Sequence, residues 1–110
     1  MLQDTISKIE DRIQNSSATK EENRAELLKL LGELKSEIAK LSQTHEEQAQ
    51  SIAGFTEISA HEATRETKNP ELVKLSVEGL ASSVDEFEGT HPKLVALVNR
   101  ICTTLSNMGI

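Results

Sequence analysis

Three histidines and one cysteine are the residues of this chain with the most chemistry to offer, and His45 has the most suggestive position. His45 and Gln48 fall in the frame of an apolar heptad repeat, at consecutive positions that would face a partner helix. If copies of that helix met around an axis, several imidazoles would lie together, and imidazole binds zinc, copper and nickel. The alternative is a polar layer that fixes register and subunit number at some cost in stability.

One histidine defines a metal site poorly, so the sequence favours the polar layer and predicts no cofactor. His45 remains the one candidate metal ligand. In a third reading the heptad simply lapses at this point and His45 is exposed.

The other reactive residues have simpler interpretations. His61-Glu62 begins like the helix motif of zinc proteases, but Arg65 stands where the second histidine is needed. Glu62 and Arg65 are expected to form a solvated ion pair. His91 is expected to cap or pack at a helix start, because no nucleophile or orienting carboxylate is identifiable beside it. Cys102 is expected to be buried as a small apolar residue. We therefore predict that the chain is not an enzyme.

A segment without proline, from residue 20 to residue 69, carries the heptad. The repeat predicts one long helix over residues 20–66, with a capping-box pattern at Thr19 and Glu22. Its seam recurs at alternating steps of four and three: Leu27, Leu31, Leu34, Ile38, Leu41, His45, Gln48, Ile52 and Phe55. A helix of this length would span about 70 Å. The short remaining helices could not cover such a seam, so we expect a homo-oligomer.

A break at Ser42-Gln43-Thr44 is the competing interpretation, since Thr44 and Glu47 could form a second capping box. The unbroken heptad phase favours continuity, because a break has no reason to preserve that phase.

Three shorter helices are predicted around the long one, over residues 3–14, 70–88 and 92–108. Asn69-Pro70 and His91-Pro92 mark two of the starts, since proline suits the first helical position. The whole chain, residues 1–110, is thus expected to be one all-α domain. It would be a helical bundle with one long coiled-coil-like helix and shorter helices packed along it. Gly32, Gly54 and Gly79 lie inside these helices; they either admit a close second layer or are a tolerated cost of about 1 kcal/mol each.

Composition narrows the classes of partner. The apolar content is 36%, with two Phe and no Trp or Tyr, so the core must be aliphatic. The net charge of −6 argues against binding to nucleic acid or to anionic lipid. No apolar run approaches the roughly 20 residues that span a bilayer, and no signal-like segment opens the chain. A lone cysteine then favours a reduced, cytoplasmic protein.

The C-terminal run carries a resemblance. His91-Pro92-Lys93-Leu94, followed by Thr104-Leu105-Ser106-Asn107-Met108-Gly109-Ile110, resembles the ending of a bacterial family of short proteins known only as a domain of unknown function. The leucine-rich stretch from Leu27 to Leu41 is similar to the N-terminal helical part of that family. Together these segments cover about half of the chain, and residues 45–66 depart from the shorter members. The resemblance implies an all-helical fold, no established activity and no site residues to transfer.

Two functions follow as expectations. The first is a structural or interaction module that acts through contacts between helices. The second is a binding protein whose polar layer at His45 and Gln48 holds a metal or a small anion.

Overall fold

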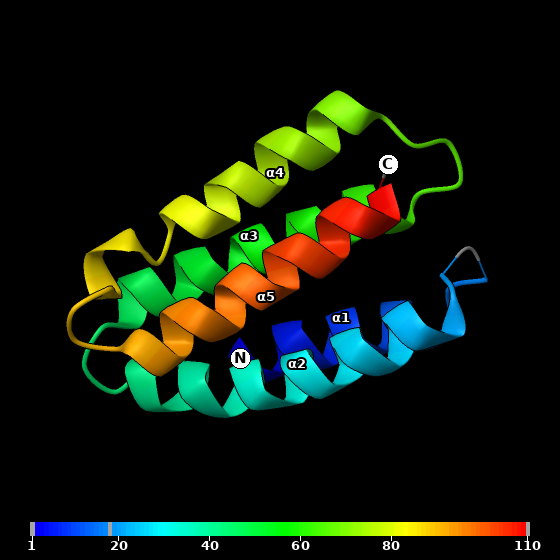
Figure 1. The fold of residues 1–110 in the computed structure, drawn as a ribbon. Helices are drawn as coiled ribbons and strands as arrows, with labels where there is room; N and C mark the ends of the chain where they lie inside the picture. Colours follow the sequence, from blue (N-terminus) through cyan, green and yellow to red (C-terminus); the bar gives the residue numbers. More distant parts are fainter. Residues whose placement is uncertain (1, 18, 110) are drawn as a thin grey trace.

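The computed structural model describes residues 2–17 and 19–109, which form five α-helices and one 3-10 turn (Figure 1). The elements are α1 (Leu2–Gln14), α2 (Glu21–Leu41), α3 (Glu46–Thr64), α4 (Pro70–Ser82), η1 (Asp85–Phe87) and α5 (Pro92–Gly109). The prediction of an all-α bundle is confirmed.

The helices lie in two layers along a common long direction. In Figure 1, α4, α5 and α2 lie side by side, with α3 and α1 behind them. Helix α1 packs on α2 and α3, while α5 packs on α2, α3 and α4. Four helices, α1, α2, α5 and α3, therefore surround one core, and α4 covers the α3–α5 side. The principal extents are 37 × 24 × 21 Å.

The core is aliphatic, as the composition predicts, with Phe87 as its buried aromatic residue. Helices α1, α2 and α5 contribute large side chains, whereas the buried surface of α3 is mostly small: Ala49, Ala53, Ala60 and Ala63. Small side chains let neighbouring helix backbones approach closely. This explains how α3 can contact α1, α4 and α5 together.

The prediction of one long helix over residues 20–66 is wrong. Helix α2 ends at Leu41 and α3 begins at Glu46, so the chain reverses between them. The Ser42 hydroxyl donates to the Ala39 carbonyl (2.9 Å), and the backbone N–H of His45 donates to the Leu41 carbonyl (2.8 Å). These bonds satisfy carbonyls that a helix end leaves free. The break thus falls where the competing interpretation put it, although His45, without a side-chain cap bond, takes the N-cap position of α3.

The heptad phase is the same on both sides of this break because α2 and α3 each carry an ordinary amphipathic stripe. A stripe of fours and threes marks any helix with one buried face, and a partner copy is not required. Folding back lets α1 and α5 cover the stripe of α2 within one chain. Helix α2 alone spans about 32 Å at 1.5 Å per residue, which fits the long dimension of 37 Å.

The predicted starts of α4 and α5 are confirmed. Asn69 caps α4 by accepting from the N–H groups of Glu71 (3.1 Å) and Leu72 (3.3 Å). The expected end of this helix at residue 88 is wrong, because α4 stops at Ser82 and η1 follows. At the start of α2 the capping box does not form: Lys20 is the N-cap and the Thr19 hydroxyl donates to the Ser16 side chain.

None of the helices in the described ranges combines the length and apolarity needed to cross a bilayer.

Candidate functional site

The residues of the predicted seam do not form an exposed surface that could meet a partner helix. Leu27, Leu31, Leu34, Ile38 and Leu41 are all buried among the chain's own helices, and so is Ile52 of α3. The remaining seam residues, His45, Gln48 and Phe55, go to different places. The expectation of an oligomer therefore loses the observation on which it rested.

His45 lies at one end of the bundle in a cluster of three rings. Its imidazole packs edge-on against Phe87, with ring centroids 5.3 Å apart, and against His91, 6.0 Å apart. Phe87 and His91 complete the cluster with centroids 5.2 Å apart. Nδ1 of His45 lies 2.8 Å from the Thr44 hydroxyl, and Nδ1 of His91 lies 2.9 Å from that of Thr90. The packing role expected for His91 is confirmed.

This ring cluster offers a metal ion two imidazoles. Catalytic zinc sites use three protein ligands and structural sites use four. In the part of the chain that the structure describes, no three His, Cys, Asp or Glu side chains group around a common metal position. Gln48 is not in the cluster; it lines a hollow between α3 and α4 instead. The two polar residues of the heptad thus form no common layer.

His61 and Cys102 lie away from this end. Nδ1 of His61 accepts from the Arg12 guanidinium (3.1 Å), which ties α3 to α1. The predicted pair of Glu62 and Arg65 is confirmed at 2.8 Å. Cys102 is buried, as expected; its thiol donates to the Val77 carbonyl (3.7 Å), and burial raises its pKa to about 11.

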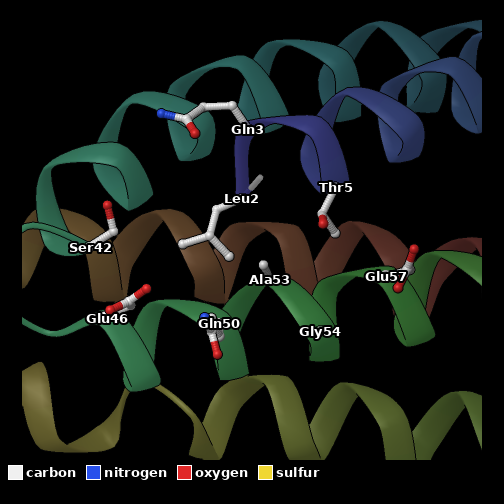
Figure 2. A pocket seen from close by; sticks show the side chains of 9 residues that line it. All are labelled: Leu2, Gln3, Thr5, Ser42, Glu46, Gln50, Ala53, Gly54 and Glu57. Atoms are coloured by element: carbon white, nitrogen blue, oxygen red, sulfur yellow. The ribbon is translucent and has the colours of Figure 1, made fainter.

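A groove lies between α1 and the first half of α3 (Figure 2). Leu2 reaches from α1 toward Ala53, and Ser42 and Glu46 lie at one end of the groove. Its polar lining side chains are two carboxylates, two amides and a hydroxyl: Glu46, Glu57, Gln3, Gln50 and Thr5.

The most unusual surface lies where α3 and α4 run side by side. Four large apolar side chains are exposed there: Phe55 by 38%, Ile58 by 50%, Leu72 by 39% and Leu75 by 54%. We call these four residues the α3–α4 face. They are the exposed large hydrophobic residues found in the described chain.

Two contacts fix how the helices present this face. The Ser59 hydroxyl donates to the Ser76 carbonyl across the interface (3.0 Å), which joins the two backbones. A Cβ at Gly79 would lie 2.5 Å from Cε1 of Phe55, so the ring lies directly on this glycine. Because Gly79 has no side chain, the Phe55 ring packs directly against the backbone of α4 at this position. Gly32 and Gly54 have no such neighbour, so for them the interpretation as a tolerated cost holds.

Beyond Phe55 the face continues into a hollow of about 470 Å³. The hollow is lined by the Phe55 ring and Gly79, by serine and glutamine side chains, and by two carboxylates: Gln48, Ser51, Phe55, Gly79, Ser82, Ser83, Asp85 and Glu86. The α3–α4 face thus has an apolar centre and an acidic end.

The heptad pattern places Phe55 in the predicted seam and assigns no role to Ile58, Leu72 or Leu75. A signal was nevertheless present in α4. Its apolar residues occupy two faces, with Val73 and Leu80 buried and Leu72 and Leu75 exposed. A helix that is apolar on more than one face needs more than one partner.

The comparisons with known proteins support the resemblance. A sequence model of the family described as "Domain of unknown function (DUF4404)" matches residues 31–110. The match begins within α2, so it contains the whole α3–α4 face and leaves α1 outside. No curated protein and no solved structure matches the chain.

Proposed function

Since the chain belongs to this family of domains of unknown function, whose description assigns no activity, we propose a function from the geometry. The chain is an interaction module that binds a helix of a partner protein on the α3–α4 face. The observation that carries this proposal is the exposure of four large apolar side chains on two adjacent helices. The proposal includes no catalytic step.

Covering this face with a partner helix is favoured by the burial of apolar surface. Fully burying a Leu, Ile or Phe side chain is worth about 1.5–3 kcal/mol. The four residues are about half exposed, so covering them would contribute on the order of 3–5 kcal/mol before the entropic cost of association. Exposed apolar side chains on two adjacent helices suit an amphipathic helix, which anchors side chains at i, i+3, i+4 and i+7.

A second copy of the chain is the alternative occupant, and it keeps the expectation of a homo-oligomer open to test. The face would then be the interface in place of the predicted seam. Light scattering on purified protein separates the two cases. A dimer that dissociates when the face is changed would identify the second copy as the occupant.

Site-specific photo-crosslinking tests the proposal in the cell. A photoreactive phenylalanine analogue replaces Ile58 on the face or, as the matched control, exposed Ser36 on α2. We expect discrete protein adducts from position 58 and none from position 36. The adduct should disappear when Leu75→Asp is added, because a buried charge disfavours docking. No adduct at position 58, or the same adducts at both positions, would contradict the proposal.

A further inference from the structure

Charge is distributed unevenly along the chain. Residues 46–88, which contain α3, α4 and η1, hold ten acidic and three basic residues, a net charge of −7. The whole chain has a net charge of −6, so the remainder, with α1, α2 and α5, is close to neutral. The negative excess belongs to the half of the bundle that carries the α3–α4 face.

The two halves also differ in the share of their carboxylates that form ion pairs. In the near-neutral half, Glu10 pairs with Lys35 (2.6 Å) and Glu26 pairs with Arg100 (2.7 Å). Glu37 lies near both Lys40 and Lys93. On α3, η1 and α4, by contrast, seven exposed carboxylates have no ion-pair partner within residues 2–17 and 19–109: Glu46, Glu47, Glu57, Glu71, Glu78, Asp85 and Glu86.

Four of these unpaired carboxylates, on α4 and η1, border the apolar centre of the α3–α4 face. Glu71 and Glu78 are four residues before and three residues after Leu75, which places them on its side of α4. Asp85 and Glu86 line the hollow that begins at Phe55. A partner that covers the α3–α4 face must therefore meet negative charge along its edge and at one end.

We propose that the occupant is a basic amphipathic helix, with an apolar stripe for the face and Lys or Arg along its flanks. This inference rests on the proposed function and names the chemistry of the partner. Charge complementarity steers such a helix to the face and suppresses wrong partners. A second copy would bring two halves of −7 together, and an anionic membrane would be repelled in the same way.

The hollow adds a specific contact. Its carboxylates and serine hydroxyls are acceptors at the end of an apolar ridge, and its volume of about 470 Å³ admits a long side chain. An Arg of the partner that lies beyond the residue packed on Phe55 reaches this hollow with its guanidinium. Its donors then meet Asp85 and Glu86 as charge-assisted hydrogen bonds. The hollow thus fixes which end of the partner helix carries the basic anchor.

Three synthetic helical peptides with the same leucine stripe test the inference against the full chain, by calorimetry or fluorescence anisotropy. Their flanks carry Lys and Arg, Gln, or Glu. We expect the basic peptide to bind at least tenfold more tightly than the Gln peptide, and the Glu peptide not to bind. Raising NaCl from about 50 to about 300 mM should weaken the basic peptide at least tenfold, because salt screens exposed charges.

Variants that change only the charge or only the apolar surface of the chain show which of its side chains bind the peptide. Asp85→Asn/Glu86→Gln should weaken the basic peptide at least fivefold without affecting the Gln peptide. Ile58→Ser/Leu75→Ser should abolish binding of both. The matched control Glu22→Gln/Glu33→Gln removes two exposed carboxylates of α2 that form no ion pair among the described residues, and it should change affinity less than twofold.

The possible failures are distinguishable. Equal affinity for the basic and Gln peptides, without salt dependence, overturns the basic partner and leaves helix docking standing. Dimerisation that Ile58→Ser/Leu75→Ser abolishes overturns it in favour of a second copy. Binding of every peptide unchanged by Ile58→Ser/Leu75→Ser, or no binding at all, overturns both the inference and the proposed function.

Discussion

The helical glycines give a quantitative test of how the α3–α4 face is built. Gly32 in α2 and Gly54 in α3 have open space where a Cβ would stand, whereas a Cβ at Gly79 in α4 meets the Phe55 ring at 2.5 Å. Alanine at Gly32 or Gly54 should stabilise the fold by about 1 kcal/mol through helix propensity. For a domain of this size that gain raises Tm by about 4–8 °C.

At Gly79 the gain in helix propensity is offset by a loss of side-chain packing. The new methyl group must turn the Phe55 ring away from α4, and the ring, now 38% exposed, loses much of its buried area. Full burial of a Phe is worth up to about 3 kcal/mol, so losing roughly half costs about 1–1.5 kcal/mol. We expect Gly79→Ala to leave stability within about 0.5 kcal/mol of the wild type, because the gain in propensity and the loss of packing nearly cancel.

A double-mutant cycle isolates this contact. In a Phe55→Ala background the clash is gone, so Gly79→Ala should now stabilise by about 1 kcal/mol, a coupling of about 1 kcal/mol. The assay is urea denaturation followed by far-ultraviolet circular dichroism, since the chain has no Trp or Tyr. Stabilisation by Gly79→Ala to the same extent in both backgrounds, and equal to that of Gly32→Ala, would refute the seating of Phe55 on Gly79.

Three further predictions follow from local contacts. Asn69→Ala removes the α4 cap and should cost about 1 kcal/mol in urea denaturation, while Asn69→Asp should retain the cap; equal losses in both variants would contradict the capping role. Arg24 donates to the carbonyls of Ile13 (3.3 Å) and Thr19 (3.2 Å) and also to that of Ser16, closing the α1–α2 turn. Arg24→Met keeps the stem and should cost about 2–3 kcal/mol; a loss below about 0.5 kcal/mol, as for a surface ion pair, would contradict this. Because its pKa is raised to about 11 from 9.0, Cys102 should alkylate at neutral pH about 100-fold more slowly than a free thiol. Its rate should keep rising about tenfold per pH unit until the pH approaches 11, and a rate at neutral pH equal to that of a model thiol would show that it is not buried.

The parts of the fold set by local signals were predictable. Asn69-Pro70 and His91-Pro92 mark the starts of α4 and α5, because a cap followed by proline acts within a few residues. The break between α2 and α3 was not predictable from heptad phase. Ser42 and Thr44 gave the right local signal. The apolar stripe of α2 is buried within the chain, however, only because α1 and α5 pack over it.

The candidate face was only partly within reach of the sequence. The pairing of His45 with His91 and of Phe55 with Gly79 depends on how the hairpins fold back, which no local pattern encodes. The concentration of carboxylates between residues 46 and 88 was visible in the sequence. The consequence of this concentration could be seen only in the structure: among the described residues, no basic side chain of α1, α2 or α5 forms an ion pair with these carboxylates.

The most direct test of the account is a map of backbone amide shifts in the isotope-labelled chain as the basic amphipathic peptide is added. We expect the largest changes around Phe55, Ile58, Leu72, Leu75 and Gly79, with further changes at η1 and small ones in α1 and α2. Changes centred on the α1–α3 groove of Figure 2, or spread evenly over the bundle, would contradict a docking face on α3 and α4.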